Sequence, residues 1–457
     1  MTTVVWFRRD LRTTDNPNLT AAAARGEVVA CYVLDPAQVA AEGPTSTGWL
    51  AANLRALNAS LDGRLCVRVG APQEVIPALA AEVGAAVVQA ASECEAPAAL
   101  RDSVVRDALA RRGVAWREVG SPYAVTPGKV TTRDGSGFKV FSAFAKSWQA
   151  HGWPDPAPSP ASLSLIPVAS DASAWRKLDK AITMCPIALP PAGEEAARQL
   201  WQKFARKRLD DYAVMRDRPD SSGTTWLSPY LRLGVIHPRT LLADLVGHSG
   251  AGVDRFIVEL AWREFYADVA WRNPSSLEAD LNPLPITYDE PGEQFTAWCE
   301  GRTGYPLVDA GQRQLLATGW MHNRVRMISA SFLTKDLHVW WKHGADFFAR
   351  HLLDSDAASN VHGWQWVAGT GTDAAPYFRI FNPVAQAERF DPDGDYVRKW
   401  VPELTHLRGG TVHRPWEAAD GYSRGYPQRI VDHETERLEA LARYQASKAP
   451  AAPPSLA

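Results

Sequence analysis

The sequence has few cysteines, and they lie far apart. Only five of the 457 residues are cysteine, and no two of them form a CxxC pair. They are Cys31, Cys66, Cys94, Cys185 and Cys299. This spacing argues against a zinc site, an iron–sulfur cluster or a disulfide framework. Such cysteine usage is typical of a reducing compartment, so we expect the protein to work in the cytoplasm.

Long apolar runs are also missing. The segment Met1–Trp6 is not a basic leader followed by an apolar stretch, so we expect no signal peptide. No apolar stretch approaches the roughly 20 residues that a membrane helix needs, so we expect no membrane partner. The excess of one charge sign is small, with a formal net charge of −2. Because a protein that binds nucleic acid over its whole surface would be basic, any DNA contact must use a local patch.

Several nucleotide and metal signatures are absent or out of place. The sequence contains no GxxxxGK[ST] motif, which argues against a P-loop ATPase. It contains no HExxH or carboxylate–histidine cluster, so we expect no metal site. Gly369–Ala374 matches GxGxxA, but it does not lie between the first strand and helix of a βαβ unit. We therefore do not interpret it as a dinucleotide fingerprint.

The N-terminal part of the chain alternates between two kinds of segment. Short apolar, β-branched runs alternate with Ala- and Leu-rich helical stretches. The predicted strands are Thr3–Phe7, Val28–Leu34, Leu65–Val69, Ala86–Ala90 and Val114–Val119. The predicted helices are Asn18–Arg25, Thr47–Leu61, Pro72–Val83 and Pro97–Arg112. This pattern predicts a Rossmann-like, five-stranded parallel sheet with helices on both faces.

The composition changes twice along the rest of the chain. Proline is frequent between Pro154 and Pro191, which predicts an extended linker on the surface. From Gly193 to about residue 445 the apolar pattern is helical. We therefore predict an α/β domain over residues 1–130, a linker over 131–192 and an all-α domain over 193–446. The Ala- and Pro-rich residues 447–457 are predicted to be a disordered tail.

Tryptophan is unusually abundant. The sequence has 18, of which 12 follow residue 200. Most of these indoles must be core residues, and only those on the motifs below are candidates for base stacking or electron transfer. Within the predicted helix Asp254–Arg272, Glu259, Trp262, Arg263 and Tyr266 fall at i, +3, +4 and +7. One face thus carries a carboxylate, an indole, a guanidinium and a phenol. The alternative is an exposed face with an i,i+4 Glu–Arg ion pair, but such a face would not need so many polar and aromatic groups.

Two further segments carry candidate binding groups, each with an ordinary alternative. In the predicted helix Leu315–His338, Asn323, Arg326 and Met327 share one side and Arg324 lies beside it. Arginine suits phosphate because its guanidinium is bidentate and always charged, although a basic surface helix would show the same pattern.

Asp354 and Asp356 are one residue apart and precede Asn360 and Trp364. They either cap a helix or contact polar groups of a cofactor. The segment Ser221–Ser228 is rich in hydroxyls and precedes a predicted helix. It either holds phosphate oxygens or is an ordinary capping loop.

Together these segments resemble the DNA photolyase and cryptochrome family, and within it the class I cyclobutane pyrimidine dimer photolyases. The resemblance covers nearly the whole chain and rests on long motifs in family order. These are VWFRRDLR (Val5–Arg12), WREFY (Trp262–Tyr266), GYPLVD (Gly304–Asp309), GWMHNR (Gly319–Arg324) and DAAPYFRIFNP (Asp373–Pro383).

The resemblance implies an antenna domain, a linker and a helical domain that binds FAD. It also implies that excited, reduced FAD gives one electron to a pyrimidine dimer that has left the DNA stack. It is then a carbon–carbon lyase that repairs UV-damaged DNA, and we expect it to be a monomer.

The resemblance also implies roles for individual residues. Those expected on the FAD phosphates and adenosine are Tyr212, Thr224, Thr225, Leu227 and Ser228. Those expected near the isoalloxazine and ribityl groups are Arg263, Arg326, Asp354, Asp356, Asn360 and Trp364, with Asn360 beside N5. Glu259 is expected to lie at the flavin and to hydrogen-bond the dimer bases. The other residues expected at the lesion or its phosphates are Arg216, Trp262, Asn323, Arg324, Met327, Trp366 and Arg379.

The electron chain and the antenna depart from the family pattern. Trp364 and Trp341 match the inner two donors, but Tyr288 stands where an outer tryptophan is usual. A tyrosine must lose its proton when it donates an electron, so we expect slower or more pH-dependent photoreduction.

Asp35 and Lys146 would allow a deazaflavin antenna, whereas Ala96–Asp102 lacks the polar residues that hold a folate in some relatives. A chain without an antenna is equally consistent with the sequence. The alternative function is a cryptochrome-like receptor that binds FAD without repairing DNA.

Overall fold

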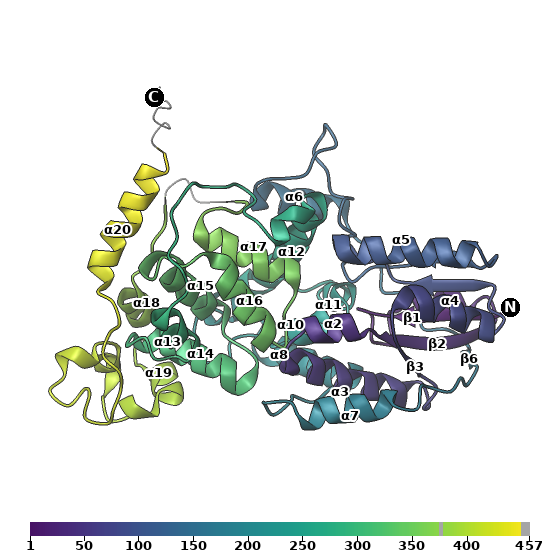
Figure 1. Cartoon of the computed structure of the whole chain (residues 1–457), viewed down its shortest axis with the longest axis horizontal. Helices are drawn as coiled ribbons and strands as arrows, with labels where there is room; N and C mark the ends of the chain where they lie inside the picture. Colours follow the sequence, from purple (N-terminus) through teal and green to yellow (C-terminus); the bar gives the residue numbers. More distant parts are fainter. Residues whose placement is uncertain (374–377, 449–457) are drawn as a thin grey trace, which may run out of the picture. The chain divides into compact units, whose positions relative to one another are not determined.

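The computed structural model describes residues 1–373 and 378–448. Figure 1 traces the helices and strands along the chain, and the contacts between residues divide it into two units. The first unit comprises residues 1–215, 223–274 and 349–358, and the second comprises 216–222, 275–348 and 359 onward. Each unit is described by itself. The domain boundaries at residues 130 and 192 stay a prediction.

The first unit is built on a parallel sheet. Its main strands are β1 (Thr3–Phe7), β2 (Glu27–Leu34), β3 (Cys66–Val69), β4 (Val87–Ala90) and β5 (Ala115–Glu118). They are ordered β3-β2-β1-β4-β5, and every neighbouring pair is parallel. The predicted five-stranded α/β fold is therefore confirmed. A sixth strand, β6 (Ser164–Leu165), pairs with the first residues of β2 and was not predicted.

Helices cover both faces of this sheet because the strand order reverses at β1. Right-handed crossovers that run from β1 to β3 and from β3 to β5 place their helices on opposite faces. The helices α1 (Pro17–Ala23), α2 (Pro36–Ala41) and α3 (Pro44–Ser60) follow the first two strands. The helices α4 (Pro72–Glu82) and α5 (Ala96–Ala110) follow the next two.

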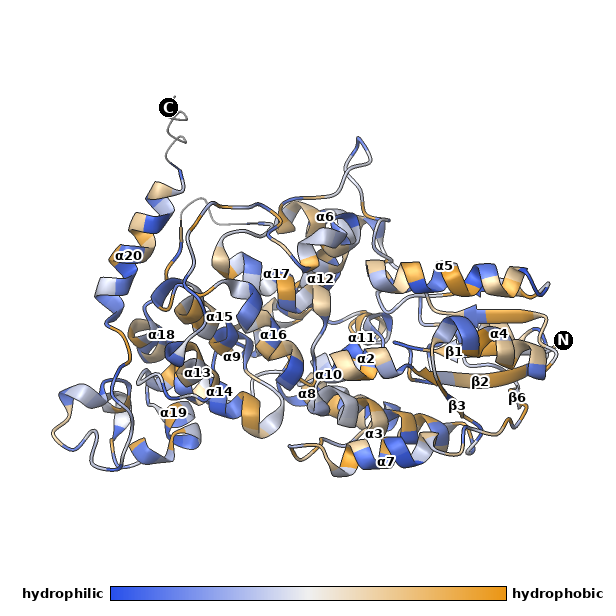
Figure 2. Ribbon diagram, in the orientation of Figure 1, coloured by the Kyte–Doolittle hydropathy of each residue, from blue (hydrophilic) through white to orange (hydrophobic). Residues whose placement is uncertain are grey.

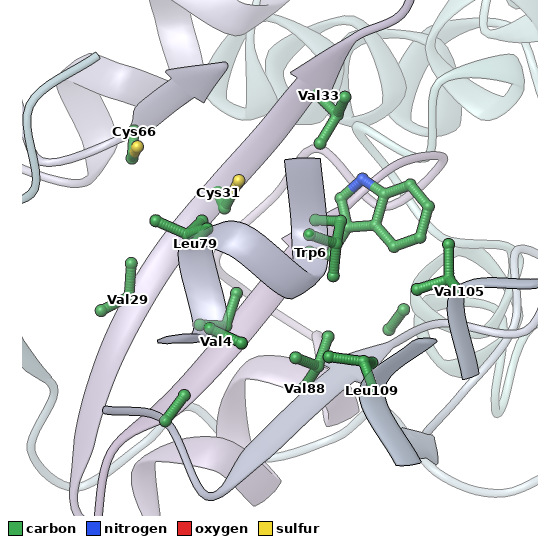
Figure 3. Packing of buried hydrophobic residues seen from close by; sticks show 14 residues of the cluster. Val4, Trp6, Val29, Cys31, Val33, Cys66, Leu79, Val88, Val105 and Leu109 are labelled. Carbon is green, nitrogen blue, oxygen red and sulfur yellow. The ribbon is translucent and has the colours of Figure 1, made fainter. Parts of the chain in front are cut away.

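The core beneath α4 and α5 contains Val4, Trp6, Val88, Leu79 and Leu109 (Figure 3). Figure 2 shows the strands as predominantly hydrophobic, as expected for a sheet buried on both faces.

The segment predicted as a linker, residues 131–192, contains two helices. They are α6 (Phe141–His151) and α7 (Ala174–Thr183). In α6 the buried residues Phe141, Phe144 and Trp148 recur at helical spacing and pack against α12 (Ala251–Arg272). In α7 the buried face packs against α3. The part predicted to be extended, Pro154–Pro191, thus contains α7, whose buried residues Ala174 and Leu178 are four positions apart, and α6 ends before it.

Helices and connecting loops make up the described chain from Gly193, in agreement with the predicted helical domain. In the first unit these are α8 (Glu194–Lys207), α9 (Tyr212–Met215), α10 (Ser228–Arg232), α11 (Pro238–Asp244) and α12. In the second unit they include α13 (Glu293–Cys299), α14 (Pro306–Thr318), α15 (Asn323–Ser331), α18 (Pro383–Phe390), α19 (Asp395–Trp400) and α20 (His433–Ala446). Two others, α16 (Trp341–His351) and α17 (Ala357–Ala368), have residues in both units.

The single helix predicted over Leu315–His338 is instead divided. Gly319 adopts the left-handed conformation, with φ of 66°, and ends α14. His322 then caps α15 by accepting a hydrogen bond from the Arg324 amide at 3.1 Å. A π-helical turn, Phe332–Asp336, follows α15. The apolar period continues across these breaks, which is why the sequence pattern alone did not reveal them.

Within the described residues, no helix is both long and apolar enough to span a bilayer. The same part of the chain contains no cluster of three or more side chains suited to a metal ion. Most of the predicted disordered tail, residues 449–457, lies outside the described residues, as do Ala374–Tyr377 of the motifs quoted above.

Candidate active site

The helix α12 carries three of the predicted site residues, together with Tyr266, on one half-buried side. Glu259, Trp262, Arg263 and Tyr266 are each partly exposed, whereas Glu264 and Phe265 are buried. Glu259 forms an i,i+4 ion pair with Arg255, with Nη2 and Oε1 2.6 Å apart. The structure therefore confirms the predicted helix and leaves a carboxylate, an indole and a phenol along its accessible side.

Trp262 stacks on an aromatic ring from the segment that was predicted as a linker. Its indole lies parallel to the Phe141 ring, with centroids 3.6 Å apart and planes at 6°. Tyr266 lies 5.3 Å from the indole in a tilted arrangement. One face of the Trp262 indole is thus covered by a neighbouring ring.

Arg263 is anchored by backbone carbonyls. Its guanidinium donates to the Pro122 carbonyl at 3.0 Å and to the Leu231 carbonyl at 3.3 Å. It also lies 4.5 Å above the Tyr123 ring, within cation–π range. The cation is held in a fixed orientation, which suits it to bind a planar or anionic group.

Glu264 organises this part of the unit, although its role was not predicted. It is 2% exposed and accepts hydrogen bonds from the Ala124 and Val125 amides and from the Trp148 indole. Burial raises the pKa of this carboxyl to about 7 despite these three donors. A glutamate on the apolar side of a predicted helix was the sequence signal that could have identified it.

The hydroxyl-rich loop precedes α10, and its residues from Gly223 onward belong to the first unit. A Cβ at Gly223 would come within 2.1 Å of the Met215 carbonyl oxygen, so only glycine fits there. The Leu227 amide donates to the Thr225 hydroxyl at 3.2 Å. Trp226 has φ of 57°, an uncommon conformation for a bulky residue that is often found at functional sites.

The remaining members of the predicted adenosine set are distributed around this loop. Thr224 is half-buried and Ser228 is exposed at the start of α10. Tyr212 is buried and packs edge-on against Phe204, with centroids 5.5 Å apart. All five residues of the set belong to the first unit.

The two aspartates that precede α17 also belong to the first unit. Asp356 is buried and forms an ion pair with Arg9, which in turn pairs with Glu95 at 3.0 Å. Asp354 is half-buried. Arg9 lies in the VWFRRDLR motif and was not among the predicted site residues. Nothing in the sequence around Arg8 and Arg9 indicates that Arg9 would pair with a carboxylate far along the chain.

In the second unit, α17 presents an amide and an indole. Asn360 donates from its side chain to the Ala345 carbonyl at 2.9 Å. Trp364 is 3% exposed and meets Trp298 edge-on, with centroids 6.0 Å apart. A Cβ at Gly344 would lie 2.2 Å from the Trp364 ring, so this glycine lets α16 approach the indole closely.

The two other predicted electron donors, Trp341 and Tyr288, are both influenced by the Asp280 carboxylate. Trp341 is fully buried and donates from Nε1 to Asp280 at 2.5 Å. Burial, followed by the charge of Asp280, raises the pKa of Tyr288. Trp340 is partly exposed and lies 5.5 Å from the Trp341 ring. This neighbouring indole was not considered as a donor in the sequence analysis.

The predicted lesion residues of the second unit form two groups. In the first, Arg324 pairs with Asp217 at 2.8 Å, and Arg216 approaches the same carboxylate at 3.5 Å. Asn323 is exposed, and its side-chain nitrogen lies 3.9 Å from the Met327 sulfur. These contacts bring four predicted residues together around α15.

The second group consists of Trp366 and Arg379, with the guanidinium 5.4 Å from the indole centroid. Arg326 donates to the Met321 carbonyl at 2.8 Å.

His322, which lies in the GWMHNR motif, is buried. Burial lowers its pKa to about 4, because the charged imidazolium would lose its water. Its Nδ1 accepts the Arg324 amide, which fixes the start of α15 and so the positions of Asn323 and Arg324.

The two predicted antenna residues lie in the first unit. The Asp35 side chain is used as the cap of α2, where it accepts the Ala37 amide at 2.9 Å. Lys146 is exposed on α6. The cap accounts for Asp35 without a ligand.

Two family profiles match this chain. The one described as the FAD binding domain of DNA photolyase matches residues 256–446, and the one described as DNA photolyase matches residues 3–161.

Curated relatives match over nearly their full length. The deoxyribodipyrimidine photo-lyase of Vibrio cholerae is 39% identical, with 97% of this chain and 99% of the relative covered. That of Escherichia coli is 36% identical, with 98% and 99% covered.

Solved structures agree with the sequence matches. A bacterial class III photolyase from Agrobacterium tumefaciens superposes with a TM-score of 0.89 at 35% identity, and 98% of each chain is covered. A cryptochrome from Synechocystis superposes with a TM-score of 0.88 at 28% identity, covering 96% of this chain and 98% of its own. An archaeal photolyase from Sulfolobus tokodaii, described with two FAD molecules, gives a TM-score of 0.86 at 26% identity, covering 98% and 100%.

Proposed function

Because this chain belongs to the DNA photolyase family, we propose that it is a deoxyribodipyrimidine photo-lyase, which uses light and FAD to split cyclobutane pyrimidine dimers in DNA. The observation that carries this proposal is the near-complete coverage of both sequences in the match with the Vibrio cholerae photo-lyase. Similarity that extends over an entire pair of chains supports a shared reaction better than a shared fold alone does.

The side chains present suit FAD chemically. Arg263 and Arg326 supply cations for phosphate or carbonyl oxygens, and Asp354 and Asp356 supply acceptors for hydroxyl or imide donors. When bound, FAD supplies the light-excited electron donor. We propose that the carbonyl contacts of Arg263 keep its guanidinium from rotating away, and that Asn360 offers an amide at the flavin ring. The buried indole of Trp364 lies one turn after Asn360 on α17.

We propose that the lesion is held by a carboxylate and two indoles. Glu259 accepts hydrogen bonds from the dimer bases, and Trp262 and Trp366 stack on them. Such stacking is typically worth about 1–3 kcal/mol per base. The resemblance supports contacts of Asn323, Arg324 and Met327 with the lesion, and of Arg216 and Arg379 with DNA phosphates. Because phosphate contacts release counterions, affinity for damaged duplex should fall as salt rises.

We also propose the finer assignments. The pair His322–Asn323 and Met327 support a cyclobutane dimer as the lesion, because relatives that repair the other main UV lesion carry a second histidine in place of Asn323. On the sequence motifs we assign the protein to class I. We propose that Trp364, Trp341 and Tyr288 carry electrons to the flavin, and that the raised pKa of Tyr288 slows this photoreduction. Tyr288→Trp should then speed it.

A deazaflavin is our proposed second chromophore, near Asp35 and Lys146. Mass spectrometry of chromophores extracted from the purified protein tests this, and FAD alone in the extract would refute it. We propose that the protein acts as a monomer in the cytoplasm, which size-exclusion chromatography and cell fractionation would check.

A second candidate function is a blue-light receptor that binds FAD without repair. The similarity to the Synechocystis cryptochrome favours it, because the two folds superpose over 96% of this chain. The presence of Glu259, Trp262, Met327 and Trp366 favours repair, since a receptor needs no lesion pocket.

The deciding experiment is the repair of a thymine-dimer oligonucleotide by the reduced protein in blue light and in the dark. Recovery of intact thymines only in the light is the expected result. An absence of recovery from a protein that has bound FAD and is photoreduced would reject repair and support the receptor.

A further inference from the structure

We propose that Phe141 is a positioning residue for the lesion: it fixes the plane of the Trp262 indole so that a flipped-out base meets a preset stacking face. This inference rests on the proposed function, because Trp262 is there assigned to the lesion. It gives a role in lesion binding to α6, a helix of the segment predicted as a linker. Figure 1 shows this helix, α6, beside α12.

The geometry of the pair differs from that of the rings around it. Phe141 and Trp262 are nearly parallel and 3.6 Å apart. Phe265, by contrast, meets Trp262 at 71° and Phe141 at 66°. Aromatic pairs favour offset or edge-to-face arrangements over face-to-face stacking. The parallel pair must therefore be imposed by the surrounding structure.

A hydrogen bond between two buried side chains holds α6 in the position that imposes this pair. The Trp148 indole donates to the buried Glu264 carboxylate of α12 at 2.5 Å. One turn after Phe141, the Phe144 ring packs on Phe265 with centroids 5.2 Å apart. Phe141 itself is only 9% exposed. It is therefore a fixed support, while the partly exposed Trp262 is the member of the pair that a ligand can reach.

A covered face has a thermodynamic consequence for binding. An unsupported indole must give up its rotamer freedom when a base stacks on it, which weakens binding by roughly two- to twelvefold for a rotamer-rich side chain. The stack with Phe141 places that cost in folding rather than in binding. Loss of the Phe141 ring should thus weaken binding of the dimer by about fivefold, within the range that this cost allows.

The test compares two phenylalanines of the same helix. Phe141→Leu removes the ring under Trp262, and Phe144→Leu removes a buried ring that packs on Phe265 instead. Dissociation constants for a thymine-dimer duplex and for the same undamaged duplex are measured in the dark with the FAD-loaded protein. The ratio to compare is the constant for the undamaged duplex divided by that for the dimer duplex. We expect Phe141→Leu to reduce this ratio about fivefold, and Phe144→Leu to leave it unchanged. Phe141→Tyr, which keeps the ring, should retain the wild-type ratio.

A double-mutant cycle separates positioning from general damage. If Phe141 acts through the indole, Phe141→Leu should have no further effect on the ratio in a Trp262→Leu background. Should Phe141→Leu fold poorly, Phe141→Met keeps the volume without the ring and takes its place. An unchanged ratio in the ring-free variants, or an equal loss in Phe144→Leu, would overturn the inference.

The failure of the inference can be distinguished from the failure of the proposed function. If the wild-type protein prefers the dimer duplex and the ring-free variants keep that preference, only the role of Phe141 is rejected. If the wild-type protein shows neither a preference for the dimer duplex nor light-dependent repair, the proposed function is rejected, and the inference with it.

Discussion

The two sides of α12 carry glutamates five residues apart that experience opposite surroundings. Glu264 is 2% exposed and accepts three hydrogen bonds from other segments. Glu259 is partly exposed, and its ion-pair partner Arg255 lies on the same helix. Burial shifts the pKa of Glu264 upward, whereas an exposed pair such as Glu259 and Arg255 contributes little to stability. Residue type alone therefore does not distinguish a structural carboxylate from one available to a substrate.

The difference also shows how the two roles depend on each other. Glu264 fixes α6 through Trp148, and α6 in turn places Phe141 under Trp262. The accessible side of α12 thus depends on the buried side for its geometry. Substitutions on the buried side should change stability most, and those on the accessible side should change activity with the fold intact.

The largest effect should come from Glu264→Ala. It leaves the Ala124 and Val125 amides and the Trp148 indole without an acceptor in a buried place. Because each buried donor without a partner costs about 1–3 kcal/mol, we expect a loss of about 3 kcal/mol or more in unfolding free energy. Chemical denaturation followed by circular dichroism would measure it, with Glu259→Ala as the matched control. Equal losses in both variants would contradict the comparison.

Next in size is the pH dependence that Glu264 confers. Its pKa is about 7 in the folded protein, against an ordinary value near 4.5 when unfolded. The folded state therefore binds the proton more tightly, so this contribution to stability is fully present below about pH 4.5 and is lost as pH rises through 7. The loss is at most about 3 kcal/mol. Glu264→Gln cannot titrate, so its stability should fall less between pH 5 and 8 than that of the wild type. Parallel curves would refute this pKa.

On the accessible side, Glu259→Gln should lower light-driven repair about tenfold or more while changing unfolding free energy by less than about 0.5 kcal/mol. The first figure reflects loss of a charged acceptor for the dimer bases, since hydrogen bonds to charged groups are worth about 1.5–3 kcal/mol. The second reflects the small contribution of a surface ion pair. Repair yield per photon and thermal unfolding would be measured on the same preparations. Full repair by the variant would remove Glu259 from the lesion site.

The sequence predicted the elements whose apolar period was continuous and the residues that lie on one helix face. The five main strands and the helix α12 are examples, and the side chains of α12 at i, +3, +4 and +7 do lie on its accessible side. The sequence could not predict partners brought together by the fold. Arg9 pairs with Asp356 across 347 positions, and Trp148 binds Glu264 across 116. A local sequence pattern carries no information about partners so far apart along the chain.

Two local signals were present but outweighed. The prolines after Trp153 suggested a linker, and this obscured the helical spacing of Phe141, Phe144 and Trp148 just before them. Likewise the apolar period between Leu315 and His338 masked the helix end at Gly319, where glycine in the left-handed conformation stops α14. In both places a capping or breaking residue was a better guide to the element than the average pattern.

The smallest predicted effect tests whether Glu259 acts by itself or as part of its ion pair. Arg255→Ala removes the charged group that pairs with Glu259 from the preceding turn of the same helix. An i,i+4 pair on a helix surface is worth about 0.3–0.5 kcal/mol, so unfolding free energy should hardly change. Repair should change less than about threefold, because the carboxylate that contacts the bases remains and only its free-state partner is lost. If Arg255→Ala impaired repair as strongly as Glu259→Gln, the pair would be the functional unit, and the accessible side of α12 would depend on internal contacts as the buried side does.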